Sequence, residues 1–243
     1  MSFLQINHLP DEALRANIIR TSLKMNALGI NQGKSGNVSA RISTSLEQGE
    51  GRGGGRTIAA NAAFLITPTG IAYEDTKPEQ IVAMRMDGTH EGTVLPSSEW
   101  RFHRDIYAAR ADVNAIVHTH SAYATTLACL DRGIPPFHYM VAVAGGKDIR
   151  CAPYATFGTQ ELSDHAVAAL ADRNVCLMSH HGMIACAVNL ERALALAVEV
   201  ETLARMYWQA VQIGEPTLLS DDEMARVLEK FATYGQQPAR SVD

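Results

Sequence analysis

Apolar residues follow two patterns along this chain. Short continuous runs such as 115–117 and 175–178 are typical of buried strands, whereas 10–29 and 190–213 repeat apolar residues at helical spacing. Short strands interleaved with helices predict an α/β protein, a single domain over residues 1–243 with an α/β/α layered fold. Helices are expected at 10–29, from 96 onward, and at 121–130, 159–171 and 190–213; strands are expected at 38–42, 64–66, 81–86, 115–120, 138–144, 149–152 and 175–179.

Residues 43–63 interrupt this pattern. The stretch Gly49–Arg56 contains five glycines and two arginines, which is too glycine-rich to hold one conformation. We expect a flexible loop between two strands. A tolerated surface insertion is favoured over a functional lid.

Composition narrows the class of protein. The 243 residues are 47% hydrophobic and 19% charged, as in an ordinary globular protein, and the formal net charge of −5 gives no reason to expect nucleic acid or an anionic membrane as partner. The four cysteines form no Cys-x-x-Cys pair and are expected to be reduced. The first residues do not resemble a signal peptide, and no apolar stretch is long enough to span a membrane, so a cytoplasmic location is expected.

His118 and His120 end the apolar run 115–117. Side chains alternate between the two faces of a strand, so both imidazoles point the same way. Two imidazoles on one face can share a divalent metal ion. A pair of histidines at a solvated strand end is the competing interpretation, and further ligands must decide between the two.

Two other positions can supply such ligands. His180 and His181 follow the apolar run 175–178, and because adjacent side chains diverge, only one of them is expected to bind metal. Glu99 lies in the expected first turn of the helix that begins at Ser97 and Ser98, where its carboxylate can complete a three-histidine site or act as a base. A glutamate in a first turn also suits the helix dipole without any further role.

Three polar loops are candidates for holding an anion. They are the helix start at Ser97 and Ser98, the loop Gly33–Asn37, and the turn Thr67–Gly70. Unpaired backbone N–H groups in such places bind anions, although each loop alone also fits plain turn chemistry.

Taken in order, these segments resemble one family. Gly36-Asn37-Val38-Ser39, Ile66–Gly70, Ser97-Ser98-Glu99, His118-Thr119-His120 and His181-Gly182 form a series similar to that of the zinc-dependent class II aldolase/adducin family, of the fuculose phosphate aldolase type. Residues 95–103, 152–158 and 180–186 resemble that type almost letter for letter. The resemblance runs from about residue 5 to Gly235, and 43–63 is its obvious departure.

The resemblance implies a mainly antiparallel central sheet, one Zn²⁺ per subunit, and a homotetramer with active sites at subunit interfaces. By this likeness His118, His120 and His181 are zinc ligands, and Glu99 is the fourth ligand until substrate displaces it and it becomes the catalytic base. The phosphate pocket is implied at Asn37, Thr69, Gly70, Ser97 and Ser98. The resemblance also implies that Tyr139 is a proton donor from a neighbouring subunit and that Phe157 and Tyr234 line the aldehyde side, and which tyrosine dominates proton transfer stays open.

The activity implied is reversible cleavage of L-fuculose 1-phosphate, through an enediolate, to dihydroxyacetone phosphate and L-lactaldehyde. Aldolases for 5-deoxy or methylthio pentulose 1-phosphates are an alternative that these motifs do not separate. A pentulose-phosphate 4-epimerase is disfavoured because such enzymes usually carry aspartate where Glu99 stands. A non-catalytic adducin-like module is disfavoured because it would lack zinc ligands. Lys34 stands where the resemblance implies a threonine near the phosphate. Its ammonium group either strengthens phosphate binding or points to solvent.

Overall fold

The computed structural model describes residues 11–42 and 62–231. Its centre is a seven-stranded sheet in the order β3-β2-β1-β4-β7-β6-β5, in which every neighbouring pair is antiparallel except β5 and β6. The mainly antiparallel sheet is therefore confirmed. The strands are β1 (Asn37–Arg41), β2 (Ala62–Ile66), β3 (Val82–Arg85), β4 (Ala115–Thr119), β5 (Arg150–Ala152), β6 (Val175–Met178) and β7 (Gly182–Ala187).

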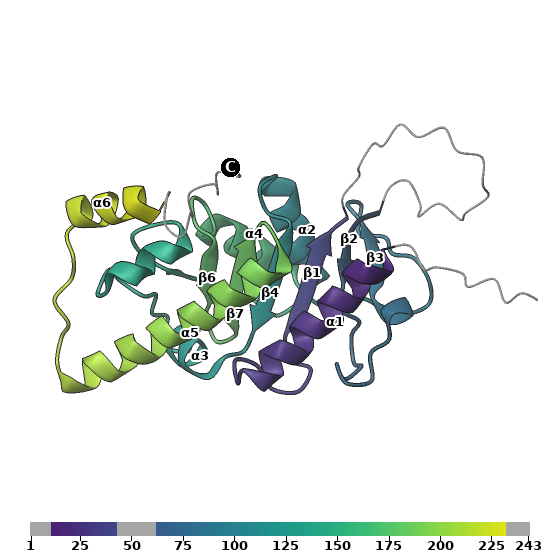
Figure 1. The fold of residues 1–243 in the computed structure, drawn as a ribbon, viewed down its shortest axis with the longest axis horizontal. Coiled ribbons are helices and arrows are strands. Elements are labelled where there is room, and N and C mark those ends of the chain that lie inside the picture. Colours follow the sequence, from purple (N-terminus) through teal and green to yellow (C-terminus); the bar gives the residue numbers. More distant parts are fainter. Residues whose placement is uncertain (1–10, 43–61, 232–243) are drawn as a thin grey trace, which may run out of the picture.

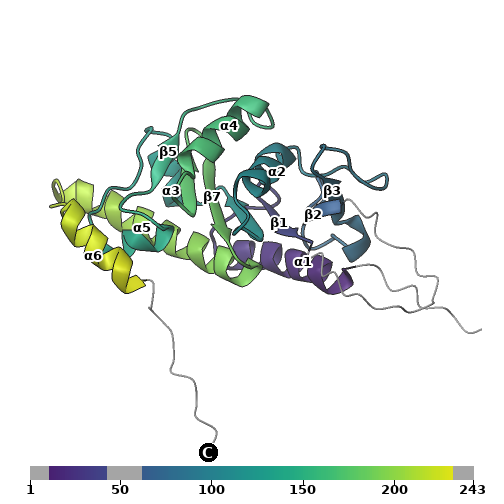
Figure 2. The same ribbon diagram turned by 90° about the horizontal axis from the view of Figure 1, so that it is seen from above.

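Helices cover both faces of this sheet (Figure 1). Figure 2 shows α1 and α5 on one side of the strands and α2 and α4 on the other, which confirms the expected α/β/α layers. The short α3 packs on α5, and α6 packs against the 3₁₀ helix η2. The helices are α1 (Glu12–Ala27), η1 (Pro78–Gln80), α2 (Trp100–Ala109), α3 (Ala122–Ala128), η2 (Tyr139–Ala144), α4 (Gln160–Ala169), α5 (Leu190–Ile213) and α6 (Asp221–Phe231).

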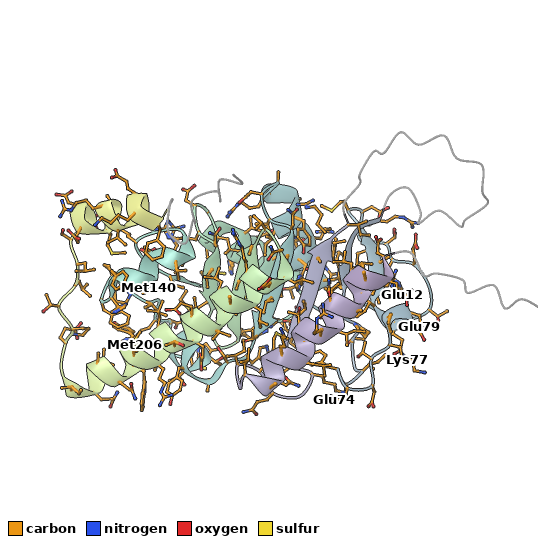
Figure 3. All side chains as sticks on the ribbon, viewed as in Figure 1. Glu12, Glu74, Lys77, Glu79, Met140 and Met206 are labelled. Carbon is orange, nitrogen blue, oxygen red and sulfur yellow. The ribbon has the colours of Figure 1, made fainter. Side chains whose placement is uncertain are left out.

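Strand alternation divides the buried apolar residues into two cores. On β4, Val117 belongs to the core under α1 and α5, whereas Ile116 belongs to the core under α2 and α4. His118 lies two residues after Ile116 and therefore points to the α2 side of the sheet. Figure 3 labels Met140 of η2 and Met206 of α5, which lie at the α6 end of the molecule and pack against the α5-side core.

The prediction of a strand at 138–144 is wrong. This segment is the 3₁₀ helix η2, in which Val141 N–H donates to the His138 carbonyl and Gly145 N–H donates to the Ala142 carbonyl. The edge of the sheet next to β6 is occupied by β5, so the segment packs instead against α5 and α6. Buried Val141 and Ala144 are three residues apart, which is the repeat of a 3₁₀ helix rather than of a strand.

Three elements were not expected from the sequence: strand β7, helix α6 and the short 3₁₀ helix η1. Strand β7 is apolar at nearly every position because both of its faces are buried, which hides the alternation of a half-exposed strand. Helix α6 is amphipathic, with Met224 buried. The remaining expected strands and helices lie within about two residues of their observed bounds, except for the start of α2 described below.

The flexible loop expected at 43–63 lies outside the described residues up to residue 61, and residues 62 and 63 belong to β2. Within 11–42 and 62–231, no helix is long and apolar enough to cross a membrane.

Candidate metal centre and active site

Four side chains from three separate places converge at one end of β4. They are Glu99, His118, His120 and His181, and one potential ligand atom of each lies within 4.8 Å of all the others. His118 Nε2 is 3.0 Å from His120 Nε2 and 3.2 Å from Glu99 Oε2, and His181 Nε2 is 2.9 Å from Glu99 Oε1. Ligands at about 2.0–2.1 Å from a tetrahedral ion would be about 3.4 Å apart, so the cluster has the size of a metal site.

Close backbone approaches bring these residues together. Gly182 begins β7 directly against the end of β4, and a Cβ atom there would lie 2.4 Å from the Thr119 carbonyl oxygen. A Cβ atom on Gly36 would lie 2.4 Å from the His118 carbonyl oxygen. Only glycine fits at either position without displacing the backbone of β4. Gly36 therefore places Asn37 beside His118, and Gly182 does the same for His181.

The turn between β6 and β7 separates the two adjacent histidines. His180 has φ of +53°, a left-handed conformation, and its exposed ring packs edge-on against Tyr154. Its N–H donates to the Ala128 carbonyl, and Ser179 Oγ donates to Asp131, so the turn is held from α3. This reversal directs His181 into the cluster and His180 away from it.

Hydrogen bonding prepares His118 to bind a cation. Its Nδ1 lies 2.9 Å from the Met183 carbonyl oxygen, which can only accept, so Nδ1 carries the proton and Nε2 presents a lone pair to the cluster. That lone pair faces His120 Nε2 and the Glu99 carboxylate. Glu99 Oε1 is buried without a hydrogen bond, since its contact with His181 lacks hydrogen-bond geometry. A cation between these groups would satisfy the His118 lone pair and the orphaned carboxylate oxygen, and three nitrogen ligands with one oxygen suit zinc.

The protonation states also suit a metal. Burial raises the pKa of Glu99, but the positive charge and hydrogen bonds that the imidazoles of His118 and His181 supply when protonated outweigh burial and hold that pKa well below its usual range. Burial, reinforced by His118 and His181, lowers the pKa of His120 from 6.5 to about 3. At neutral pH the cluster therefore offers a carboxylate and a neutral His120 imidazole, which are the forms that bind metal.

The three polar loops lie beside this cluster. Ser97 N–H donates to the Thr67 carbonyl over 2.9 Å, and Thr69 N–H donates to the Leu95 carbonyl over 3.1 Å, which joins the turn Thr67–Gly70 to the helix start at Ser97 and Ser98. Lys34 Nζ donates to the Gly70 carbonyl over 2.7 Å and joins the loop Gly33–Asn37 to them. The three loops thus form one surface, on which Thr69, Gly70 and Ser98 are exposed and Ser97 is buried.

Helix α2 begins later than expected. Its first residue is Trp100, and Glu99 is the N-cap rather than a first-turn residue. Pro96 bridges to Pro68 in antiparallel fashion, which keeps the chain extended before Ser97. Glu99 N–H contacts Ser97 Oγ at 3.3 Å, so the serines form the turn that leads into the helix.

Asn37 is placed differently from the other residues of the expected phosphate pocket. Its side chain is buried and donates from Nδ2 to Glu99 Oε2 over 2.9 Å. Its Oδ1 contacts His103 Nε2 at 2.5 Å. His103 was not singled out from the sequence, although it follows Glu99 by four residues, the spacing that places both on one helix face.

Two of the aromatic residues expected at the active site, Tyr139 and Phe157, are exposed. Phe157 adjoins Gly158, whose carbonyl accepts from Arg101 of α2 over 2.7 Å. Tyr139 begins η2 and is 51% exposed. Tyr234 lies outside the described residues. An open pocket of about 700 Å³ borders His120 and is lined by Gln32, Ser35, His120, Ala122, Thr125, Thr126, Cys129 and Leu130.

Comparison with known proteins gives a consistent result. The profile described as Class II Aldolase and Adducin N-terminal domain matches residues 16–208. A 5-methylthioribulose-1-phosphate/5-deoxyribulose-1-phosphate aldolase from Rhodospirillum rubrum is 51% identical over 223 residues, covering 92% of this chain and 93% of that protein. An L-fuculose phosphate aldolase from Escherichia coli is 50% identical over 223 residues, covering 91% and 95%. A solved L-fuculose 1-phosphate aldolase matches with a TM-score of 0.81 and 38% identity, covering 90% of this chain and 96% of that one.

Proposed function

We propose a specific reaction for this chain, which belongs to the class II aldolase and adducin family and is a class II aldolase. The proposed reaction is reversible cleavage of L-fuculose 1-phosphate, or a related ketose 1-phosphate, to dihydroxyacetone phosphate and an aldehyde. The observation that carries this proposal is the cluster of Glu99 with three histidines directly beside the surface formed by the three polar loops.

The site residues have distinct roles in this proposal. His118, His120 and His181 would hold one zinc ion, and Glu99 would be the fourth ligand in the absence of substrate. Bound there, zinc would supply a Lewis acid that stabilises negative charge developing on the substrate's ketone oxygen. In the direction of synthesis, the Glu99 carboxylate takes a proton from the hydroxyl-bearing carbon of dihydroxyacetone phosphate, and that carbon's electron pair forms the bond to the aldehyde carbon. Cleavage reverses these steps.

The substrate phosphate is assigned to the loop surface. Backbone N–H groups around Gly70 and the hydroxyls of Thr69, Ser97 and Ser98 provide neutral donors, which suits a chain of net charge −5. Lys34 adds a cation at this surface, where it already contacts Gly70. Asn37 supports this pocket through its place beside Glu99.

Proton transfer to the aldehyde oxygen is assigned to a tyrosine. Tyr139 of a neighbouring subunit is the proposed donor, with Tyr234 as the other candidate, and Phe157 lines the aldehyde side. Exposed Tyr139, Tyr154 and Phe157 support an assembly in which these rings become buried at subunit contacts. We propose a homotetramer, for which light scattering should give a mass about four times 26.3 kDa. A cytoplasmic location completes the proposal, supported by four unpaired cysteines.

Two substrate classes remain in competition. The relative acting on methylthio and deoxy pentulose phosphates is 51% identical and the fuculose phosphate relative 50% identical, so overall identity favours neither. The two classes differ at the aldehyde end, where one methyl or methylene group changes binding by about 1–3 kcal/mol. Their phosphate and ketone ends are the same.

A coupled assay for dihydroxyacetone phosphate tests the proposal. Zinc-loaded protein is offered L-fuculose 1-phosphate, 5-deoxyribulose 1-phosphate and 5-methylthioribulose 1-phosphate. The 4-epimerisation of L-ribulose 5-phosphate is measured separately, because it releases no dihydroxyacetone phosphate. Cleavage of at least one ketose 1-phosphate is expected, and the largest kcat/KM identifies the aldehyde. The proposal is wrong if none is cleaved, and turnover of L-ribulose 5-phosphate alone would favour the epimerase.

A further inference from the structure

A stripe of polar side chains runs through the core between α2 and β1. Glu99, His103 and Tyr107 follow one another at four-residue spacing on the same face of α2. They meet Asn37 and Ser39, which lie two residues apart on the same face of β1. All five side chains are buried, with residue exposures between 0% and 5%. Burying five polar side chains here is costly unless they are hydrogen-bonded, and each of them makes at least one hydrogen bond.

The hydrogen bonds in this stripe have one direction. The Glu99 carboxylate only accepts, so Asn37 must present its NH₂ group to Glu99 and its Oδ1 to His103. His103 Nε2 must then carry the proton. Burial, with a smaller effect of His118, lowers the pKa of His103 from 6.5 to about 3, so the ring is neutral and its Nδ1 is an acceptor.

The same logic extends to the far end of the stripe. Ser39 Oγ lies 2.7 Å from His103 Nδ1 and donates to it, and Tyr107, 2.8 Å from Ser39 Oγ, donates to the serine. Burial raises the pKa of Tyr107, which therefore keeps its proton. Arg41 anchors this end, since its Nη2 donates to the Tyr107 carbonyl and its guanidinium lies over the Tyr107 ring.

We propose that His103 is a positioning residue of the aldolase, which acts through Asn37 to hold the Glu99 carboxylate. The N–H of His103 keeps the Asn37 amide in the one orientation that donates to Glu99. The reversed amide would turn Oδ1 toward a carboxylate and repel it. Asn37 thereby holds Oε2 and leaves Oε1 without a hydrogen bond, facing the cluster. This inference rests on the proposed role of Glu99 as base.

A purely structural role explains the stripe less well. Apolar side chains of similar volume would fill the space between α2 and β1 without burying five polar groups, as the neighbouring Phe102 and Ile106 do in the same core. The chain of hydrogen bonds ends on the Glu99 carboxylate, and the donor and acceptor of each bond in it are fixed. Such a chain supports the orientation of one group better than it supports stability.

The tautomers provide a test that needs no substrate. Nitrogen NMR of ¹⁵N-histidine-labelled, zinc-loaded protein should show His103 as the neutral Nε2–H tautomer with a slowly exchanging proton, assigned by its loss in His103→Gln. His118 is the internal control, with the opposite Nδ1–H tautomer set by Met183. An Nδ1–H tautomer or a protonated ring at His103 overturns the inference whether or not the parent enzyme is active.

Two matched substitutions provide the kinetic test. The Gln amide in His103→Gln reaches the place of Nε2 and keeps an N–H for Asn37, whereas the shorter Asn amide in His103→Asn reaches only the place of Nδ1 near Ser39. We expect kcat of His103→Gln within about threefold of the parent and kcat of His103→Asn about 10–100-fold lower, with KM for substrate and zinc content nearly unchanged in both. Equal kcat values in the two variants, both high or both low, overturn the inference. A parent that cleaves no ketose 1-phosphate instead refutes the proposed function.

Discussion

His118 Nδ1 lies 2.9 Å from the carbonyl oxygen of Met183, and this contact determines which nitrogen of His118 faces the candidate metal centre. The two residues belong to neighbouring antiparallel strands, β4 and β7. A backbone carbonyl cannot change its direction without disrupting the sheet. The ligand orientation of His118 is therefore built into the strand pairing rather than into a movable side chain.

Zinc removal tests the centre as a whole. A chelator is expected to abolish cleavage and lower the unfolding temperature, because converging lone pairs and a buried carboxylate lose their shared cation. A metal present at 100 times its dissociation constant stabilises the folded state by about 2.7 kcal/mol. Calorimetry and the aldolase assay, before chelation and after zinc is restored, measure both effects. Full activity in demonstrably zinc-free protein would contradict the assignment.

Glu99→Gln tests the base. Glutamine has nearly the same shape as glutamate but cannot take up a proton, so zinc-dependent folding should persist while kcat falls by about 10²–10⁴-fold. Zinc content by elemental analysis and kcat in the coupled assay are the measurements. Near-normal turnover with bound zinc would count against Glu99 as base.

The adjacent histidines offer a matched pair of substitutions. His181→Asn should reduce zinc content and activity because it removes an imidazole nitrogen that lies 2.9 Å from Glu99 Oε1. His180→Asn should leave both near the parent values, because that side chain is exposed and asparagine tolerates its φ of +53°. Zinc titration and kcat distinguish them. The opposite ranking would mean that the turn between β6 and β7 presents His180 instead.

Gly182→Ala tests the close approach of β7 to β4. The added Cβ would lie 2.4 Å from the Thr119 carbonyl oxygen and 3.0 Å from His120 Cδ2. We expect a loss of about 1–3 kcal/mol in the free energy of unfolding, together with weaker zinc binding. Gly214→Ala is the control, since nothing lies within 4 Å of a Cβ there, and it should change stability by less than about 0.5 kcal/mol. Equal effects in urea unfolding would refute the steric argument.

The pH dependence of metal-free protein tests the neutrality of His103. Its folded-state pKa, about 3, lies below the unfolded value of 6.5 because the ring is buried. Between these values the unfolded chain binds a proton that the folded protein does not, so stability falls as pH falls. His103 contributes about 1.4 kcal/mol per pH unit in this window. His103→Gln should show a correspondingly shallower slope in urea unfolding between pH 6.5 and 5, and an unchanged slope would show that His103 is not held neutral.

Local sequence patterns predicted most elements but failed where burial was unusual. Residues 182–187 were missed as a strand because both faces of β7 are covered, and 138–144 was assigned as a strand although the sheet edge beside β6 is taken by β5. Both errors concern which neighbours an apolar segment acquires. Hydropathy along the chain does not contain that information.

The sequence by itself determined that His118 and His120 share a face, because the two-residue repeat of a strand is local geometry. It also carried the family likeness, from which Glu99 and His181 followed as further members of the site. The tertiary structure alone decided that Asn37 and His103 hold Glu99. That arrangement depends on α2 crossing the polar face of β1, and Asn37 and Glu99 are 62 positions apart in the chain. Contacts of this kind come from the register of packed elements, whereas the periodicity of a single element comes from its own backbone.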